Sequence, residues 1–231
     1  MSELPLIGRG RSADVFDAGD GRVLRRYRTT SAGSVEREAI AMRFLRAHGV
    51  PVPEVFETSG VDMVMERLDG PTMLDMLRSK PWRAHAVGRT LRELHARIHA
   101  VPAHGLDIPR FSEGDAVLHF DLHPDNVMLT AAGPVIIDWS NVGLGDPLAD
   151  VMHSWMAMVT SSPENVPLAL RPILQHVRRR LAEGYLGGTP VATDPTARRW
   201  LSAVCERRLL DPNVLEHERD QVRALAARYP V

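Results

Sequence analysis

The feature that most constrains this chain is a polar stretch enclosed by two short β-like segments. The sequence LHFDLHPDNVML contains Asp121 and Asn126 five residues apart, and Asp138 in VIIDW follows twelve residues after Asn126. Pro124 and the β-like flanks argue against a helix here, so we expect Asp138 to close a β-hairpin. Two carboxylates and one carboxamide then meet at one end of this hairpin. Hard oxygen donors suit Mg²⁺, and a carboxylate base beside bound Mg²⁺ is what phosphoryl transfer asks of a protein.

Two pairs of histidines at i, i+4 spacing offer alternative metal sites. The pair His119 and His123 would suit a metal-dependent hydrolase, but this pairing needs a helix where proline argues against one. The pair His95 and His99 falls on a predicted helix, where Arg97 and the neighbouring apolar stripe predict a solvated edge. We therefore expect neither pair to bind a metal.

The N-terminal sequence LIGRGRSADVF has the spacing G-x-G-x-x-[G/A]-x-V through Gly8, Gly10, Ala13 and Val15. This spacing occurs in dinucleotide-binding turns between a strand and a helix, in the glycine-rich loop that covers ATP phosphates in kinases, and in ordinary turns. No helical pattern follows, because DVFDA, a GDG turn and RVLRRYR are typical of two strands in a hairpin. A glycine-rich loop that joins two strands is therefore favoured.

Hydrophobic periodicity divides the chain into a β-rich part and a helical part. In the first 67 residues we expect three strands, a helix over 34–49, and two further strands around a turn at Ser59 and Gly60. Beyond Gly70 we expect long amphipathic helices over 83–101, 147–159, 167–186, 197–210 and 213–229, with β-like segments over 116–122 and 134–139. The expected fold class is α+β with two lobes, a small β-rich lobe over residues 1–67 and a larger helical lobe over residues 68–231.

Composition limits the partners and the location of the chain. The 231 residues carry a formal net charge of −1, which gives no general attraction to nucleic acid or to an anionic membrane. Cys205 is the single cysteine, so no internal disulfide forms and a reducing cytoplasm is the expected location. The start MSELPLIGRG lacks a signal-peptide pattern, and no apolar run approaches membrane-spanning length. Lys80 is the single lysine, so chemistry that normally uses lysine must use arginine.

The sequences HFDLHPDN and IDW resemble the H-x-D-x-x-x-x-N motif and the metal-binding Asp of kinase-like phosphotransferases. The His-Pro pair is most similar to the aminoglycoside phosphotransferase and choline kinase branch, and the resemblance covers well over half of the chain. It implies a two-lobed protein kinase-like fold in which Asp121 is the catalytic base and Asn126 and Asp138 bind Mg²⁺. His119 would brace the loop, and Asp150 in GDPLAD would hydrogen-bond the loop backbone from the following helix.

The resemblance also implies a nucleotide site in the first lobe. Family members place a cation on the third strand opposite a Glu on the first helix, and here Arg25, or its neighbour Arg26, would pair with Glu38. The usual Val/Ala-x-Lys frame favours Arg25, because Val23 then lies on the same strand face and contacts the adenine. The linking segment MVMERLDG would hold the adenine edge, mainly through backbone groups. The implied nucleotide-binding residues are Gly8, Gly10, Ala13, Val23, Arg25, Glu38, Met65, Glu66 and Leu68.

The implied activity is Mg²⁺-dependent transfer of the γ-phosphate of ATP, or of GTP, to a hydroxyl group of a small molecule. A protein acceptor is disfavoured, because only Ser140–Pro147 separates IDW from the next helix and leaves no room for an activation segment. An aminoglycoside acceptor would need an acidic wall, which Asp211, Glu216, Glu218 and Asp220 could form, although neighbouring arginines weaken this interpretation. The alternative is a nucleotide-binding protein without transfer activity, suggested by the missing lysine and third glycine. The acceptor and the oligomeric state stay open.

Overall fold

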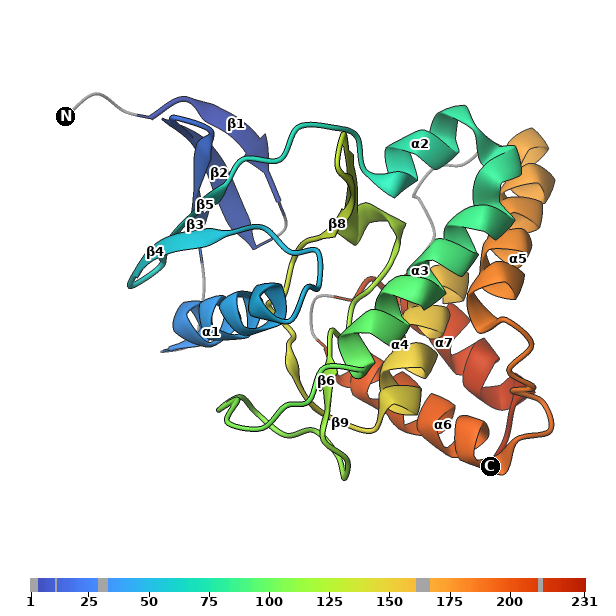
Figure 1. Ribbon diagram of the computed structural model, residues 1–231. Coiled ribbons are helices and arrows are strands. Elements are labelled where there is room, and N and C mark those ends of the chain that lie inside the picture. The colour runs from blue at the N-terminus through green and yellow to red at the C-terminus, as the bar shows by residue number, and fades with distance from the viewer. Residues whose placement is uncertain (1–3, 11, 29–32, 161–166, 212–213) are drawn as a thin grey trace.

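The first part of the chain forms an antiparallel sheet with one helix packed against it (Figure 1). The computed structural model describes residues 4–10, 12–28, 33–160, 167–211 and 214–231. The five strands lie in the order β1-β2-β3-β5-β4, and the helix connects β3 to β4. The elements are β1 (Leu6–Arg9), β2 (Ala13–Gly19), β3 (Arg22–Tyr27), α1 (Ser34–Ala47), β4 (Val55–Ser59) and β5 (Asp62–Glu66). The predicted order of strands and helix is confirmed.

Three parts of the sequence-based expectations fall outside the described residues. They are residues 1–3 of the N-terminal segment, Arg11 in the glycine-rich loop, and Asn213 at the start of the last predicted helix.

The apolar periodicity of α1 explains how this helix lies on the sheet. Val35, Ala39, Met42 and Leu45 recur at helical spacing, and all four are at most 1% exposed. They pack in one continuous core with the residues of β4 and β5. The same helix also buries Glu38, and a carboxylate removed from water must find partners.

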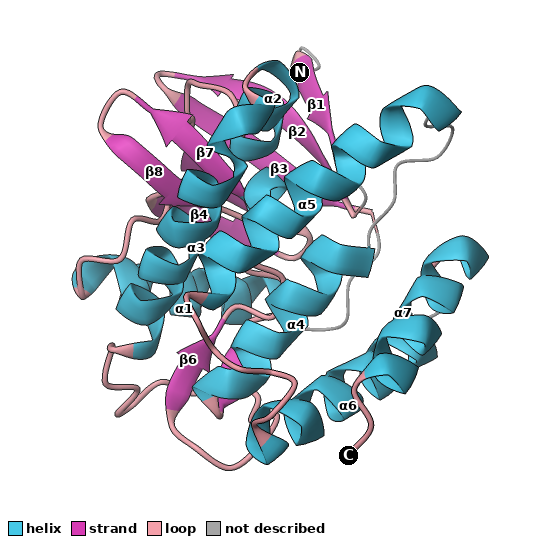
Figure 2. Cartoon of the chain, turned by 90° about the vertical axis from the view of Figure 1, so that its right-hand side faces the viewer, coloured by secondary structure: helices cyan, strands magenta, loops and turns pink. Residues whose placement is uncertain are grey.

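The second part of the chain is built mainly of helices. Figure 2 shows α3, α4 and α5 side by side, with the pair α6 and α7 next to them. The α-helices are α2 (Met73–Ser79), α3 (Ala84–His99), α4 (Pro147–Thr160), α5 (Arg171–Leu186), α6 (Pro195–Leu210) and α7 (Glu216–Arg228). The five long helices agree with the predicted ones, except that a 3₁₀ turn at Leu168–Leu170 delays the start of α5. Helix α2 was not predicted, although Thr72 and Asp75 form a capping box at its start.

Two short strand pairs lie between the sheet and the helices. β6 (Ala116–Leu118) pairs with β9 (Gly143–Gly145), and β7 (Val127–Thr130) pairs with β8 (Gly133–Ile136) in the predicted hairpin. Both predicted β-like segments end early, because Phe120 (φ 55°) and Asp138 (φ 61°) adopt left-handed backbone conformations. For a residue with a Cβ atom this conformation costs energy and turns the chain out of the strand direction.

Helices α3 and α5 cross at very short range, and glycine makes this possible. A Cβ atom on Gly88 of α3 would collide with the carbonyl oxygen of Leu181 and would lie 2.6 Å from the main-chain nitrogen of Tyr185. A Cβ atom on Gly184 of α5 would likewise collide with the carbonyl oxygen of His85. The two glycines therefore set the distance between the helices, and they bring Tyr185 of α5 against the buried face of α3.

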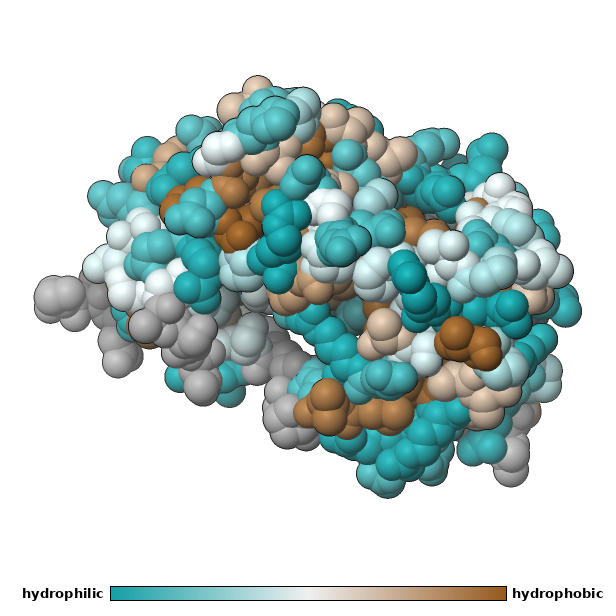
Figure 3. All heavy atoms as spheres, turned by 90° about the horizontal axis from the view of Figure 1, so that it is seen from below, coloured by the Kyte–Doolittle hydropathy of each residue, from teal (hydrophilic) through white to brown (hydrophobic). Residues whose placement is uncertain are grey.

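The length of the helices and the hydropathy of the surface are the features that relate to membrane insertion. Among the described helices, none combines the length with the apolar character that a membrane-spanning segment requires. On the face seen in Figure 3, hydrophilic residues predominate and apolar residues gather in small groups between them.

We expect Gly88→Ala to lower the free energy of unfolding by about 2–3 kcal/mol, because backbone atoms of α5 cannot move aside as a side chain can. For a domain of this size, thermal denaturation should show a melting temperature lower by roughly 5–10 °C. Arg89→Ala, on the exposed side of the same helix, is the matched control and should change stability by less than about 0.5 kcal/mol. Equal stability of the two variants would contradict the close crossing.

Candidate active site

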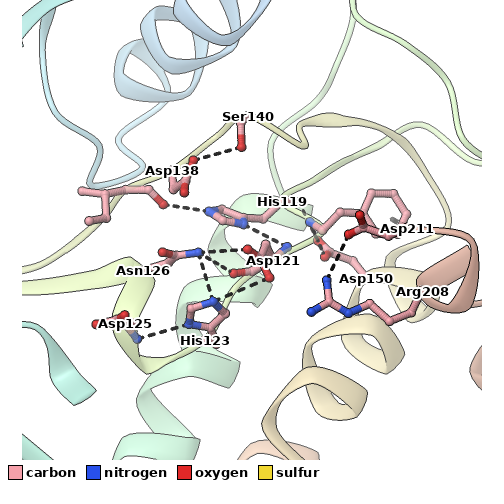
Figure 4. A network of polar contacts seen from close by, with 12 residues as sticks. His119, Asp121, His123, Asp125, Asn126, Asp138, Ser140, Asp150, Arg208 and Asp211 are labelled. Carbon is pink, nitrogen blue, oxygen red and sulfur yellow. Dashed lines mark hydrogen bonds and ion pairs between the residues drawn. The ribbon is translucent and has the colours of Figure 1, made fainter. Parts of the chain in front are cut away.

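The polar stretch and the IDW sequence are joined by a main-chain hydrogen bond. The Ile137 N–H donates to the carbonyl oxygen of Asn126 at 3.0 Å, so Asp138 follows directly on a residue bonded to Asn126. A 3₁₀ turn at Pro124–Asn126 leads into β7 and carries Asn126 inward, where it is buried. The loop from His119 to Asn126 and the residues after β8 thus form one site, as Figure 4 shows.

Asp121 lies at the centre of this loop and is held by two neighbours. The Asn126 side-chain amide donates to the Asp121 carbonyl oxygen at 2.9 Å, and the His123 Nε2 lies 3.6 Å from the carboxylate Oδ1. Burial disfavours an ionised carboxyl group, yet His123 outweighs burial and lowers the pKa of Asp121 below its ordinary value. The side chain of Asp121 keeps 30% of its surface exposed. An ionised, partly accessible carboxylate of this kind can accept a proton from a bound hydroxyl group.

Asn126 and Asp138 offer the oxygen atoms that a hard cation needs. The amide nitrogen of Asn126 is engaged with Asp121, and Figure 4 shows the amide oxygen pointing away from Asp121. The Asp138 Oδ1 accepts from Arg25 Nη2 at 2.8 Å and from Ser140 Oγ at 2.9 Å, so a cation would bind through Oδ2. Burial would raise the pKa of Asp138, but Arg25 and Ser140 hold it below its ordinary value. This donor set fits Mg²⁺.

Arg25 lies between two acidic partners from different parts of the fold. Its Nη1 is 3.0 Å from Glu38 Oε1 on α1, and its Nη2 is 2.8 Å from Asp138 Oδ1. The predicted ion pair between Arg25 and Glu38 is therefore present. The alternative residue, Arg26, points to the other face of β3 and pairs with Asp62 at 2.6 Å.

Glu38 is the buried anchor of this arrangement. It is 2% exposed, and its second oxygen accepts the Tyr27 hydroxyl at 2.6 Å. Burial raises the pKa of Glu38, while the charge of Arg25 and the Tyr27 hydrogen bond oppose that rise. Burial also works against the Arg25 charge, but Glu38 and Asp138 more than compensate and raise the pKa of Arg25. Both carboxylate oxygens thus have a partner, as a buried ion pair requires.

His119 and Asp150 support the loop that carries Asp121. The Asp150 carboxylate, which is fully buried, accepts the His119 and Phe120 N–H groups, each at 2.8 Å. The His119 ring accepts the Asp121 N–H on Nδ1 at 3.2 Å and donates from Nε2 to the Ile137 carbonyl at 3.1 Å. These hydrogen bonds fix the left-handed turn at Phe120 and so determine where the Asp121 carboxylate points. The supporting contacts expected of His119 and Asp150 are present.

The predicted glycine-rich loop lies where β1 passes into β2. Gly8 is within β1 and pairs with Val15 of β2, and the Gly10 N–H donates to the Ala13 carbonyl at 2.8 Å. Neither glycine has a positive φ angle, and a Cβ atom on Gly8 would meet only the Val15 Cβ at an ordinary 3.7 Å. The fold itself therefore does not require glycine at this position, whereas close approach of a phosphate would.

The residues expected around the adenine come from two neighbouring strands. Val23 of β3 and Met65 of β5 are direct cross-strand partners, and each is 7% exposed. Glu66 and Leu68 follow along the chain towards the helices and are half-buried. The Glu66 N–H already donates to the Glu54 carbonyl at 2.8 Å. A hydrogen bond between the Glu66 main chain and a ligand would therefore use the Glu66 carbonyl oxygen as the acceptor.

Sequence reasoning missed some of these residues and misplaced others. His123 was considered only as a possible metal ligand, whereas it contacts Asp121, as its position two residues along an extended stretch could have indicated. Tyr27 likewise shares a strand face with Arg25, whereas nothing local to the sequence points to Ser140. The solvated edge expected for His95 and His99 is wrong, because their exposed fractions are 0% and 12%. Helices α4 and α5 cover this face of α3, which local periodicity does not reveal.

Comparisons of the sequence with known proteins identify a family whose reaction class suits the geometry of this site. A sequence model of the phosphotransferase enzyme family (APH) matches residues 3–116 and 110–201. These matches cover most of the 231 residues, so the chain belongs to this family. The chain is also 30% identical over 115 residues to the EKC/KEOPS complex subunit BUD32 of Encephalitozoon cuniculi (strain GB-M1). That match covers 49% of this chain and 54% of BUD32, so the chain spans about half the length of this curated relative.

Solved structures with the same fold cover nearly the whole chain. A choline/ethanolamine kinase family protein from Mesorhizobium loti has a TM-score of 0.65 and 18% identity, with 99% of this chain and 91% of that chain covered. A thermostable mutant of aminoglycoside phosphotransferase APH(4)-Ia has a TM-score of 0.64 and 18% identity, with 98% and 92% covered. The same enzyme was also solved as a ternary complex with ADP and hygromycin B, with a TM-score of 0.63 and 17% identity. At these identities the similarity establishes the kinase-like α+β fold.

We expect Glu38→Ala to lower the free energy of unfolding by about 3 kcal/mol, because it leaves the Tyr27 hydroxyl and one end of the Arg25 guanidinium buried without partners. Urea denaturation measures this loss. The matched control is Asp62→Ala, which removes the partner of Arg26, a side chain 53% exposed to solvent. The loss there should stay below about 1 kcal/mol. Similar losses in both variants would contradict a buried, charged pair at Glu38.

Proposed function

We propose that this protein transfers the γ-phosphate of ATP to a hydroxyl group of a small molecule and that the reaction depends on Mg²⁺. One observation carries the proposal: Asp121, Asn126, Asp138, Arg25 and Glu38 form one continuous set of contacts between the sheet and the helical part. Asp121, Asn126, Asp138 and Glu38 are the residue types that phosphoryl transfer uses at these places, and Arg25 takes the place of the usual lysine. Family membership supports the reaction class.

Asp121 is the proposed catalytic base, because its carboxylate is ionised and partly accessible. It would accept the proton of the acceptor hydroxyl as that oxygen attacks the phosphorus atom. Asn126 and Asp138 would hold Mg²⁺, which neutralises charge on the phosphate oxygens when it is bound. His123 stays next to Asp121 and favours the ionised carboxylate until the proton arrives.

Residues 1–67 are the proposed nucleotide-binding lobe. Gly8 and Gly10 would let the β1–β2 loop approach the phosphates, while Val23 and Met65 would contact the adenine from the sheet. Arg25 would give the α- and β-phosphates a fixed cation, since a guanidinium group can bind phosphate oxygens through two parallel hydrogen bonds. For this it would exchange its contact with Asp138 for a phosphate and keep its contact with Glu38.

Residues 68–231 are the proposed catalytic and acceptor-binding lobe. Only residues 139–146 separate the proposed metal ligand Asp138 from α4, which favours a small acceptor over a peptide. The acids expected to form a wall for a polycationic acceptor each have an arginine partner, which weakens the case for an aminoglycoside. These pairs are Arg208 with Asp211 and Glu218, Arg219 with Glu216, and Arg223 with Glu216 and Asp220.

ATP consumption measured with and without Mg²⁺, over a panel of sugars, nucleosides, amino alcohols and aminoglycosides, tests the proposed function. We expect Mg²⁺-dependent ADP release that at least one acceptor class stimulates. Asp121→Asn should lower kcat by about 10²- to 10⁴-fold while leaving ATP affinity nearly unchanged, because the base acts on the acceptor hydroxyl.

Asp125→Asn is the control, because Asp125 lies in the same loop and its carboxylate bonds to Thr72 rather than to the site. It should retain most of the activity. If the wild-type protein binds ATP but no acceptor stimulates ADP release, the chain is a nucleotide-binding protein without transfer. Equal loss of ATP binding and turnover in Asp121→Asn would mean that Asp121 is a metal ligand or a structural residue.

Asp138→Ala should weaken Mg²⁺-dependent ATP binding roughly tenfold more than Asn126→Ala, because an anionic oxygen contributes more to a divalent site than a neutral amide. Titration calorimetry with and without Mg²⁺ measures the difference. Melting temperatures of both variants report whether either change disturbs the fold. Unchanged affinity for ATP and Mg²⁺ in Asp138→Ala would refute the metal assignment.

A further inference from the structure

A second cluster of potential metal ligands lies beneath the catalytic loop. His95 and His99 are one helical turn apart on α3, and Asp150 faces them from α4. The Asp150 Oδ2 is 3.3 Å from His95 Nε2 and 3.0 Å from His99 Nε2, and the three ligand atoms lie within 4.8 Å of one another. His95 and Asp150 are fully buried, and His99 is 12% exposed.

The two distances from Asp150 to the histidines are close to the edges of a tetrahedral metal site. Metal–ligand bonds of about 2.0–2.1 Å place neighbouring ligand atoms about 3.3 Å apart around a tetrahedral ion. The two imidazole rings stack with centroids 4.9 Å apart and planes 23° from parallel, so both rings lie along the same side of α3. Two imidazole nitrogens and one carboxylate oxygen form a donor set typical of Zn²⁺ and chemically similar ions.

The hydrogen bonding of His95 gives an independent reason to expect a ligand. Its Nε2 is buried beside Asp150 but has no aligned hydrogen-bond partner among the described residues, although buried polar atoms normally have one. A bound metal ion would give this buried nitrogen the partner that it lacks among the described residues.

The outer contacts of the cluster are those that orient ligands in metal sites. The Nδ1 of His95 is 2.5 Å from the Tyr185 hydroxyl of α5, which fixes the orientation of the ring. The other oxygen of Asp150, Oδ1, accepts the Phe120 N–H at 2.8 Å. In metal proteins, ligating histidines and carboxylates are commonly held by partners of this kind.

We propose that His95, His99 and Asp150 supply three ligands of one divalent transition-metal ion of the Zn²⁺ type, with a water molecule as the fourth ligand. The ion would tie α3 to α4 and, through Asp150, to the main chain that immediately precedes Asp121. It differs from the proposed Mg²⁺ site in its nitrogen donors and in its position behind the loop. Occupancy of this site does not depend on the proposed transfer reaction.

Titration of the chelator-treated, full-length protein with Co²⁺ tests the site directly. We expect one equivalent to bind with the intense visible absorption of tetrahedral Co²⁺, Zn²⁺ to displace it, and the melting temperature to rise with either ion. Asp138→Ala should keep this spectrum, because the proposed Mg²⁺ ligands are not involved.

His95→Leu should lose the Co²⁺ spectrum and the thermal shift, whereas His104→Leu should retain both, since His104 is an exposed histidine after α3. If His95→Leu fails to fold, the wild-type spectrum and its metal stoichiometry decide the question. A wild-type protein that shows neither a tetrahedral Co²⁺ spectrum nor a thermal shift refutes the site. So does a folded His95→Leu variant with an unchanged spectrum.

Discussion

The arrangement of this molecule depends on one guanidinium group. Arg25 on β3 contacts Glu38 on α1 and Asp138 after β8, so one side chain joins the sheet, its helix and the end of the β7–β8 hairpin. The side chain is 13% exposed, and a cation at that depth requires partners of opposite charge. Three segments far apart in the sequence are thereby brought to one point, and the proposed chemistry is located there.

Local patterns predicted much of this arrangement, and their limits are physical. The period of α1 identified its buried face. The Val/Ala-x-Lys frame that the family resemblance implies favoured Arg25 over Arg26, and the structure agrees, because a shift by one residue points the side chain away from Glu38. The polar stretch gave Asp121, Asn126 and Asp138. The burial of His95 could not be predicted, because it results from α5, whose approach depends on glycines almost 100 residues apart.

Asp150 has a wider structural role than its sequence context indicates. Its two oxygen atoms contact the main-chain N–H groups of His119 and Phe120 and the rings of two histidines, and the carboxylate itself is fully buried. A carboxylate with this many partners stays ionised, and its pKa is far below the ordinary range despite complete burial. This network holds the left-handed turn at Phe120. The conformation of the loop therefore depends on how α3 and α4 pack around Asp150.

The use of arginine at position 25 has a consequence for chemical labelling. Some nucleotide probes acylate the amine of a lysine in a nucleotide site, and they react with the uncharged form of that amine. An arginine guanidinium group stays charged and does not react in this way. The single lysine, Lys80, lies at the end of α2 and is not part of the sheet that carries Arg25. A proteome survey that detects nucleotide sites through lysine acylation would therefore pass over the proposed nucleotide site of this protein.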